Sequence, residues 1–339
     1  MDFSNILIRA TNWVGDAVMS LASLRAVRVR FPSARITILA KATVADLYTI
    51  ERVSDEIIIY DSKSRWGLIR ELRALRFDCA ILLQNAFEAA LIAWMAGIPN
   101  RIGYDHDGRG FLLTHAVAVP KRGEIPRHQR FYYLELLHRA GLIEVAANRA
   151  ATGRERHHNG PGDNKDLVAQ ASARERTKII GVSPGAAYGG AKRWLPERFA
   201  EAAAKLARVR GASIALFGSP GERALCEQVE KLLAGHNVTN HAGQTTLAQF
   251  IELAAQCEVF LTNDSGAMHI ASALGVPTVA IFGATDDAAT GPTGPKARVV
   301  RETVECSPCL LRECPIDHRC MTRVSADRVV KEALALLLD

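Results

Sequence analysis

This 339-residue chain lacks a run of apolar residues long enough to cross a membrane, which takes about 20 in succession. Its most apolar stretch, residues 79–98, is interrupted by Gln84, Asn85 and Glu88. A secretory signal is missing too, because Asp2 stands where positive charge is needed and the apolar run at residues 6–8 is too short. We therefore expect a cytoplasmic protein that meets a membrane only through its surface.

Aromatic residues make up only 6% of the chain, and basic residues are rarely interleaved with them. This scarcity argues against a platform for nucleic acid. The chain is 48% hydrophobic and 23% charged, as globular proteins are, which argues against disorder. A net charge of +6 favours anionic partners. At about 150 residues per domain, the length predicts two domains.

Two familiar motifs are also absent or weak. No G-x-G-x-x-G follows any predicted strand, so a dinucleotide oxidoreductase lacks its main fingerprint. Asp105 and Asp107 form the acid-x-acid pair by which many sugar transferases hold a divalent metal. The surrounding residues 104–110 have the composition of a turn, however, and such a triplet is common by chance.

The seven cysteines are few and unevenly spread. Three stand alone and are most simply core thiols of a reducing compartment: Cys79, Cys226 and Cys257. Four others share one short segment with the spacing C-x2-C-x4-C-x5-C: Cys306, Cys309, Cys314 and Cys320. A zinc site normally shows two short, well-separated pairs. Zinc ligands, a redox-labile disulfide and free structural thiols therefore all remain open, and we assign no catalytic role.

What the chain does contain is a repeated alternation of short β-rich apolar runs with helical patterns. In the first half, the strands are expected at residues 6–8, 36–39, 57–60 and 79–83, and the helices at residues 16–31, 43–50, 64–76 and 86–96. Apolar strands separated by helices predict a parallel sheet that is covered on both faces.

The pattern breaks at residues 144–176, which we interpret as a linker with one helix near residues 166–173. It then restarts with strands expected at residues 178–183, 213–217, 259–262 and 278–282, and helices at residues 195–210, 222–233, 247–256 and 266–274. A last helix, residues 325–337, begins with Ser325 as its cap. The chain thus reads as two doubly wound α/β domains, in which ligands bind beyond the carboxyl ends of the strands.

The first strand leads into the segment RATNWVGD, residues 9–16, and then directly into a helix. In one interpretation, Gly15 allows the turn while Asp16 caps the helix and offsets its dipole. The alternative rests on position, because a carboxylate after the first strand of a doubly wound domain points to the ligand edge. Asp16 could there act as a general base.

The second domain opens with the glycine-rich segment VSPGAAYGGAKRWLP, residues 182–196. Its glycines let the backbone approach a ligand, and Lys192 is a compact cation that suits phosphate. The segment nearly matches the phosphate loop of nucleotide triphosphatases, but Ala191 precedes the lysine and Arg193 stands where Ser or Thr is required. We reject that family. The position after a strand favours phosphate binding over a flexible loop with a solvated lysine.

The strongest local signal is the segment LTNDSGAMH, residues 261–269. A strand ends there and a helix begins, so the free N–H groups of the helix offer an anion site that Ser265 and Gly266 leave accessible. Alternatively, Asp264 could be a helix cap and His269 a core histidine. Chance explains the presence of both Asp264 and His269 in this segment much less readily than it explains either residue alone.

Together these segments resemble the ADP-heptose:lipopolysaccharide heptosyltransferases of Gram-negative bacteria, glycosyltransferase family 9. The resemblance extends over nearly the whole chain. It rests on NWVGDAVM at residues 12–19, PGAAYGGAKRW at 184–194, TNDSGAMH at 262–269 and FGAT at 282–285. The segment GPTGP at residues 291–295 and the late cysteines resemble the heptosyltransferase II branch.

The resemblance implies the GT-B architecture, with two doubly wound Rossmann-like domains facing across a cleft. The expected parts are an acceptor-binding domain at residues 1–150, a linker at 151–176 and a donor-binding domain at 177–324. A C-terminal helix at residues 325–339 is expected to cross back to the first domain. The protein would work at the inner face of the cytoplasmic membrane.

The implied reaction is inverting and needs neither metal nor cofactor. The donor would be ADP-L-glycero-β-D-manno-heptose and the acceptor an anionic heptosyl-Kdo2-lipid A. Asp16 matches the proposed base and Lys192 the diphosphate-binding lysine, while Glu222 aligns more loosely with a nucleoside contact. The implied donor residues are Asn12, Gly15, Lys192, Arg193, Gly218, Glu222, Asp264, Ser265, Gly266 and His269.

Acceptor contacts are hypothesised for three basic residues, Lys63, Arg65 and Arg127, which could equally be solvated surface charges. Other hypotheses are heptosyltransferase I, another nucleotide-sugar transferase or epimerase of the same fold, and a non-enzymatic adaptor that senses nucleotide sugars or a membrane surface.

Overall fold

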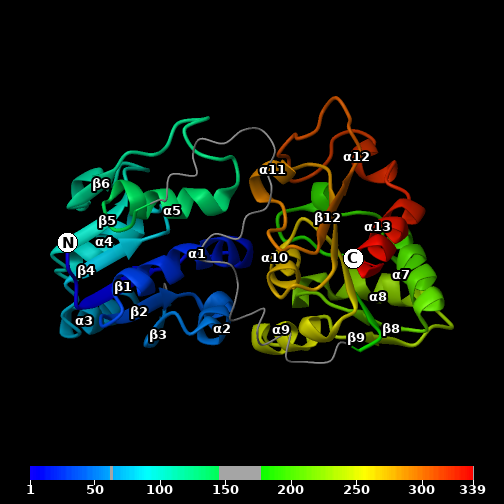
Figure 1. Cartoon of the computed structure of the whole chain (residues 1–339), viewed down its shortest axis with the longest axis horizontal. Coiled ribbons are helices and arrows are strands. Elements are labelled where there is room, and N and C mark those ends of the chain that lie inside the picture. Colours follow the sequence, from blue (N-terminus) through cyan, green and yellow to red (C-terminus); the bar gives the residue numbers. More distant parts are fainter. Residues whose placement is uncertain (62–63, 145–176, 339) are drawn as a thin grey trace. The chain divides into compact units, whose positions relative to one another are not determined.

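The computed structural model describes residues 1–61, 64–144 and 177–338, and the chain divides into two compact units, Met1–Asp166 and Leu167–Asp339 (Figure 1). The linker expected at residues 151–176 and its helix lie outside the described residues. The expected domain boundaries stay predictions. No helix in the described ranges combines the length and apolarity that crossing a membrane requires.

The first unit is built on one sheet whose strands are all parallel, in the order β3-β2-β1-β4-β5-β6. Its strands are β1 (Asn5–Arg9), β2 (Arg35–Ala40), β3 (Glu56–Ile59), β4 (Cys79–Leu82), β5 (Asn100–Tyr104) and β6 (His115–Val117). Its helices are α1 (Val14–Arg30), α2 (Ala42–Glu51), α3 (Arg65–Ala74), α4 (Phe87–Met95) and α5 (Gln129–Arg139), with the 3-10 turn η2 (Gly110–Leu112).

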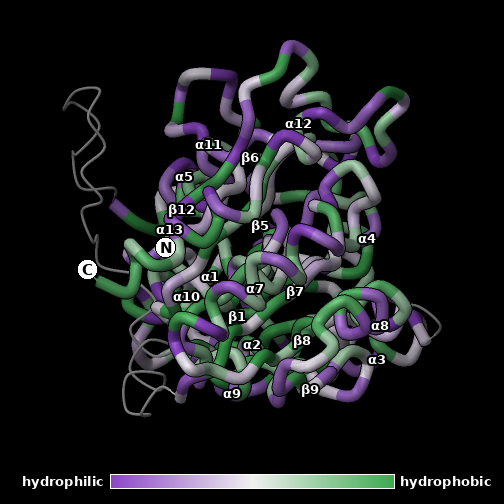
Figure 2. The backbone as a smooth tube through the Cα atoms, turned by 90° about the vertical axis from the view of Figure 1, so that its right-hand side faces the viewer, coloured by the Kyte–Doolittle hydropathy of each residue, from purple (hydrophilic) through white to green (hydrophobic). Residues whose placement is uncertain are grey.

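Helices cover both faces of this sheet, because successive apolar residues of each strand point to opposite sides. Thus Ile6, Leu7 and Ile8 of β1 are all buried. Helix α1 packs against α2 and α5, whereas α3 and α4 pack together over Leu7, Ala80 and Leu82. Figure 2 shows α3 and α4 on one side of β1 and β5, and α1 and α5 on the other. The strand order reverses between β1 and β4.

The second unit repeats the plan with the strand order β12-β11-β10-β7-β8-β9, again all parallel. Its strands are β7 (Ile179–Ser183), β8 (Ser213–Leu216), β9 (Val238–Asn240), β10 (Val259–Asn263), β11 (Thr278–Phe282) and β12 (Ala297–Arg301). Its helices are α7 (Pro196–Arg210), α8 (Arg223–Leu232), α9 (Leu247–Gln256), α10 (Gly266–Ala273), α11 (Asp287–Thr290), α12 (Arg319–Thr322) and α13 (Ala326–Leu338), with the 3-10 turns η4 (Gly190–Lys192) and η5 (Pro220–Glu222).

Local sequence explains where these helices begin and end. Helix α7 starts with Pro196. Proline lacks a backbone N–H, and at the first helical position an N–H would have no partner within the helix. The helix ends at Gly211, whose φ of 62° is left-handed. Ser325 accepts a hydrogen bond from the backbone N–H of Arg328 at 3.3 Å, which confirms the predicted cap of α13. Helix α13 packs against α7, β11 and β12 of its own unit, and its crossing to the first unit stays a prediction.

The predicted doubly wound α/β architecture is confirmed for each unit, and several details are corrected. Strands β5, β6, β9 and β12 and helix α5 were not predicted from the apolar pattern. Strands β6 and β9 are only three residues long, and the other three elements mix charge, glycine or aromatic rings with their aliphatic residues. Asp16 is not the cap of α1, since Trp13 occupies that position without a side-chain cap bond and Asp16 lies in the first turn. Asp264 is not the cap of α10, since Ser265 is.

Candidate functional site

Asp16 lies in the first turn of α1, directly beyond the carboxyl end of β1 and at the point where the strand order reverses. Its Oδ1 accepts a hydrogen bond from the hydroxyl of Tyr133 in α5 at 3.1 Å. Tyr133 is buried, and this burial together with the nearby Asp16 charge raises the pKa of its phenol well above the ordinary value. The phenol therefore stays protonated and keeps donating to the carboxylate at neutral pH.

Asn12 is fixed by the arginine that ends β1. The Arg9 guanidinium donates to Asn12 Oδ1 at 3.0 Å and to the carbonyl of Ala10 at 2.7 Å, and it lies 4.6 Å from the Tyr60 ring centre. Burial lowers the pKa of Arg9 to about 10, so it remains a cation at neutral pH. The buried Arg9 cation thus stabilises, through Asn12, the turn that carries Asn12, Gly15 and Asp16.

The three predicted acceptor residues differ in what the structure shows of their surroundings. Arg65 begins α3, and its Nε lies 2.7 Å from Glu88 Oε1, while Tyr60 donates to the other Glu88 oxygen at 2.7 Å. Arg127 is exposed, and Lys63 lies outside the described residues. The chain before α3 follows β3 and the chain before Asp16 follows β1, and these strands lie two spacings, about 10 Å, apart in the sheet. Acceptor contacts by these residues stay predictions.

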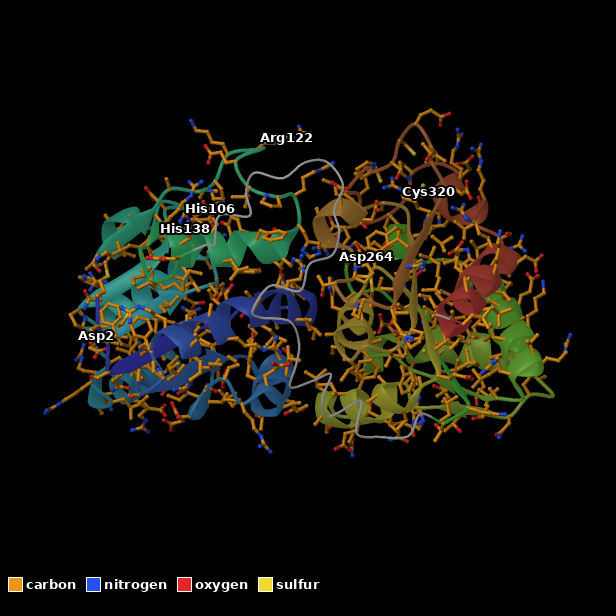
Figure 3. The ribbon with its side chains drawn as sticks, viewed as in Figure 1. Asp2, His106, Arg122, His138, Asp264 and Cys320 are labelled. Carbon is orange, nitrogen blue, oxygen red and sulfur yellow. The ribbon has the colours of Figure 1, made fainter. Side chains whose placement is uncertain are left out.

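In the second unit, Lys192 and Asp264 meet where the order of the strands reverses between β7 and β10. The Lys192 Nζ lies 2.6 Å from Asp264 Oδ2, and the same oxygen accepts a hydrogen bond from the Thr285 hydroxyl at 2.6 Å. The Asp264 side chain, labelled in Figure 3, is only 5% exposed. The ammonium also lies 4.9 Å from the centre of the Tyr188 ring. Three loops, which follow β7, β10 and β11, therefore fix the position of one lysine.

The N-terminus of α10 adjoins this pair. Ser265 caps the helix by accepting from the N–H of Met268 at 3.4 Å, and its hydroxyl lies 3.1 Å from that of Thr262. Gly266 is the first helical residue and has no side chain to cover the free N–H groups. His269, one turn further, is buried in α10, so its predicted donor contact stays a prediction.

Asn263 connects the two loops that carry Lys192 and Asp264. Its amide donates to the carbonyl of Pro184 at 2.7 Å and accepts from the N–H of Trp194 at 2.9 Å. Arg193 donates to the carbonyl of Ala186 at 3.2 Å and thereby closes the glycine-rich loop on itself. The loop is an ordered structure, and its lysine cannot be described as solvated.

Glu222 and Gly218 belong to the loop after β8, next to β7. Glu222 Oε2 accepts from both the N–H and the hydroxyl of Ser219 at 2.8 Å, which makes it part of a capping box. A Cβ at Gly185 would lie 2.1 Å from Glu222 Oε1, so the glycine is needed for close approach of the two loops. At Gly218, a Cβ would meet the Cys226 sulfur at 2.9 Å.

The segment with four cysteines supports the glycine-rich loop. Glu313 accepts from the N–H of Gly190 at 2.9 Å, and the carbonyl of Arg312 accepts from the N–H of Ala191 at 2.9 Å. A Cβ at Gly189 would lie 2.2 Å from that carbonyl oxygen. All seven cysteines are free thiols: Cys306 is exposed, Cys309 and Cys314 are half-buried, and Cys79, Cys226, Cys257 and Cys320 are buried.

No group of three or more His, Cys, Asp and Glu side chains within the described ranges could hold a metal ion. Asp107 and Gly108 have φ angles of 52° and 69° and form a turn, as their composition predicts. The Asp107 carboxylate lies 2.8 Å from His106 Nδ1. This acid-x-acid pair therefore shows no arrangement that points to a metal.

The profile of Glycosyltransferase family 9 (heptosyltransferase) matches residues 65–319 of the chain. The chain belongs to glycosyltransferase family 9. It is therefore a glycosyltransferase, and this family membership agrees with two loop clusters, each at the carboxyl edge of a doubly wound sheet.

Curated relatives of this family 9 glycosyltransferase include lipopolysaccharide heptosyltransferase 2 of Escherichia coli (strain K12). It is 31% identical over 349 residues, covering 98% of this chain and 99% of the relative. The enzyme of the same name from Salmonella typhimurium is 33% identical over 310 residues, with 87% of each chain covered. The solved structure of the E. coli ADP-heptose lipopolysaccharide heptosyltransferase II is 30% identical, covers 98% of both chains and superposes with a TM-score of 0.78.

Sequence reasoning about this glycosyltransferase missed three residues of the two clusters. Tyr133 lies 117 positions from Asp16, so no local pattern connects the two. Thr285 lies three residues after β11, in the FGAT segment, and inspection of the loop after each strand would have given it a role. Tyr188 was read only as part of a glycine-rich loop, although an aromatic ring beside a lysine is a recognisable cation–π partner.

Proposed function

We propose that this glycosyltransferase moves L-glycero-D-manno-heptose from ADP-L-glycero-β-D-manno-heptose to the heptosyl-Kdo2-lipid A core of lipopolysaccharide. The names of its relatives support ADP-heptose as the donor and lipopolysaccharide as the acceptor. The observation that carries the proposal is the Lys192–Asp264–Thr285 cluster beside the start of α10, because it presents a fixed cation and free N–H groups to an anion.

Asp16 is proposed as the general base. An acceptor hydroxyl gives its proton to the Asp16 carboxylate while its oxygen forms a bond to the anomeric carbon of the heptose. The bond from that carbon to the diphosphate breaks on the opposite face, so the configuration inverts. Tyr133 supports this role, since its hydrogen bond holds the carboxylate in one orientation at the edge of the sheet.

Negative charge grows on the departing ADP, and the second unit offers two ways to stabilise it. Lys192 retains two ammonium hydrogens beyond the one directed at Asp264, and the helix N-terminus at Ser265 and Gly266 adds N–H groups. These groups do the work that a divalent cation does in other transferases. We therefore propose a metal-independent reaction that uses no cofactor.

The remaining donor residues fit an extended ligand. The loops that carry Glu222, Lys192, Asp264 and Thr285 follow four adjacent strands, β8, β7, β10 and β11. Three strand spacings amount to about 14 Å, which suits a nucleotide sugar better than a single phosphate. We propose that Glu222 and Gly218 adjoin the nucleoside, and that the donor also meets Arg193, His269, Asn12 and Gly15.

We further propose that the first unit binds the acceptor and the second the donor, with the C-terminal helix crossing between them. Closure of the two units on their ligands would exclude water, which could otherwise hydrolyse the donor. The net charge of +6 suits an acceptor whose Kdo carboxylates and phosphates are anionic.

The proposal is tested with the Asp16→Asn variant, which keeps the shape of the side chain and its contact with Tyr133. We expect heptosyl transfer to fall by about 10²- to 10⁴-fold with the affinity for ADP unchanged. Asp46→Asn, at another acidic position of the first unit, serves as the control and should keep full transfer. Normal turnover of Asp16→Asn would contradict the role of Asp16 as the base. Loss of activity in EDTA would contradict the proposal that the reaction needs no metal.

A further inference from the structure

The exposed Trp and Phe side chains of the described ranges all belong to the first unit. Four of the five lie on the layer that α3, α4 and η2 form over one face of the sheet: Trp66 (71% exposed), Phe87 (40%), Trp94 (53%) and Phe111 (78%). The rings of Phe87 and Phe111 are 6.1 Å apart, which makes them one continuous apolar surface. Exposed aromatic rings that adjoin one another, as Phe87 and Phe111 do, mark a surface that binds a partner, whereas single exposed rings do not.

Helix α4 is apolar on both of its sides. Its inner side buries Ala89, Ala90, Ile92 and Ala93 against the sheet. Its outer side presents Phe87 and Trp94, two turns apart on one face, while Leu91 between them is half-buried and packs partly against the core. The helix has a single charged residue, Glu88, which is paired with Arg65. Packing against the core thus leaves two of its large apolar side chains, Phe87 and Trp94, unexplained.

The neighbouring helix α3 supplies positive charge to the same layer. It carries Arg65, Arg70 and Arg73 against one acidic residue, Glu71. Arg65 and Arg73 both reach across to α4, the first to Glu88 and the second to the carbonyl of Met95 at 2.5 Å. Arg65 and Arg73 therefore border α4 near its two ends, and Arg70 is a further, exposed cation of α3.

We propose that the outer surface of α3, α4 and η2 docks the enzyme onto an anionic phospholipid membrane. The aromatic rings would enter the interface between headgroups and acyl chains, while the arginines meet the lipid phosphates. Trp and Phe beside arginines match both the apolar and the charged part of such a surface. The inference rests on the proposed function only in that the proposed acceptor is a lipid.

The position of this surface within the first unit supports a role in acceptor delivery. Phe87 begins α4 five residues after the end of β4, at the same carboxyl edge of the sheet where Asp16 lies. Asn85 donates to the hydroxyl of Tyr132 at 2.8 Å, and the next residue, Tyr133, holds Asp16. A membrane that contacts α4 would therefore present headgroup sugars near the proposed base.

The test is flotation of the full-length protein with vesicles of phosphatidylcholine, with or without phosphatidylglycerol. We expect the wild type to bind the anionic vesicles more tightly. The triple variant Phe87→Ser, Trp94→Ser, Phe111→Ser should bind at least about tenfold more weakly, and Arg70→Gln about fivefold more weakly. The control Val209→Ser, Leu232→Ser removes two exposed apolar side chains of the second unit and should bind as the wild type does.

Heptosyl transfer to an acceptor dispersed in detergent is measured in parallel. The triple variant should retain this activity, because its side chains are exposed and lie outside the proposed catalytic groups. If the wild type fails to transfer heptose, the proposed function is wrong while the vesicle result stands. Equal vesicle binding by the wild type and the triple variant would overturn the docking surface. So would a dimer in solution that the triple variant abolishes, since the surface would then belong to a second copy.

Discussion

Replacing Lys192 by methionine should lower the stability of the second unit as well as its affinity for ADP. The side chains of Lys192 and Asp264 are only 14% and 5% exposed, so the variant leaves a carboxylate almost fully buried without its cation. Breaking such a pair from one side costs about 3–5 kcal/mol. We expect about 3 kcal/mol, because Thr285 still donates to the same oxygen.

The partner variant, Asp264→Asn, should cost less, about 1–2 kcal/mol, since the freed ammonium can turn toward water. In the double variant neither charge is left unpaired. The double variant should therefore lose about 2 kcal/mol less free energy of unfolding than the sum of the losses in the two single variants. Urea unfolding of the four proteins, each at the same pH and salt concentration, measures this coupling energy.

Calorimetric titration with ADP completes the experiment. The Lys192→Met variant should bind ADP about 10- to 100-fold more weakly, the value of a charged hydrogen bond. Lys205→Met removes a half-buried lysine of α7 that pairs with Glu201 and Asp327, and should leave ADP affinity unchanged. Losses of stability that add to within about 0.5 kcal/mol would refute a coupled pair. Unchanged ADP affinity of Lys192→Met would refute its role at the diphosphate.

Two further outcomes follow from buried ionisable groups. Burial raises the pKa of Tyr48 to about 12, so the stability that this phenol contributes is present below pH 10 and is lost as the pH rises toward 12. When the pH rises from 9 to 11, the free energy of unfolding measured in urea should fall by about 1.4 kcal/mol less in Tyr48→Phe than in the wild type. Equal falls in the two proteins would contradict the raised pKa of Tyr48. Burial also raises the pKa of Cys320, whereas Cys306 is exposed. Iodoacetamide at neutral pH should therefore label Cys306 first, as peptide mapping would show; faster labelling of Cys320 would contradict this order.

The carboxyl-edge positions of the main site residues could be predicted from sequence because the apolar runs before them are unambiguous. Asp16, Lys192 and Asp264 each follow a strand of consecutive buried aliphatic residues, which places them at the ligand edge. What these residues touch could not be predicted. The Lys192–Asp264 contact joins positions 72 residues apart, and only the order of β7 and β10 in the sheet brings them together.

Local rules also failed where side chains found distant partners. Aspartate is a residue type that favours helix caps, yet neither Asp16 nor Asp264 caps its helix. Asp16 accepts a hydrogen bond from Tyr133, and Asp264 forms an ion pair with Lys192. A cap bond contributes about 1 kcal/mol, which a charged contact of the kind seen at Asp264 readily exceeds. The strand β12 was missed because Arg298 and Arg301 interrupt its apolar residues at the edge of the sheet.

The central claim is tested most directly by incubating the purified enzyme with ADP-heptose and two defined acceptors, Kdo2-lipid A and its monoheptosylated form. Mass spectrometry of the products then counts the heptoses gained. We predict the gain of one heptose on the monoheptosylated acceptor, with full yield in EDTA and an initial rate about 10²- to 10⁴-fold lower with Asp16→Asn. Transfer to the unheptosylated acceptor alone would assign the enzyme to the heptosyltransferase I reaction, and no transfer to either acceptor would contradict the proposed function.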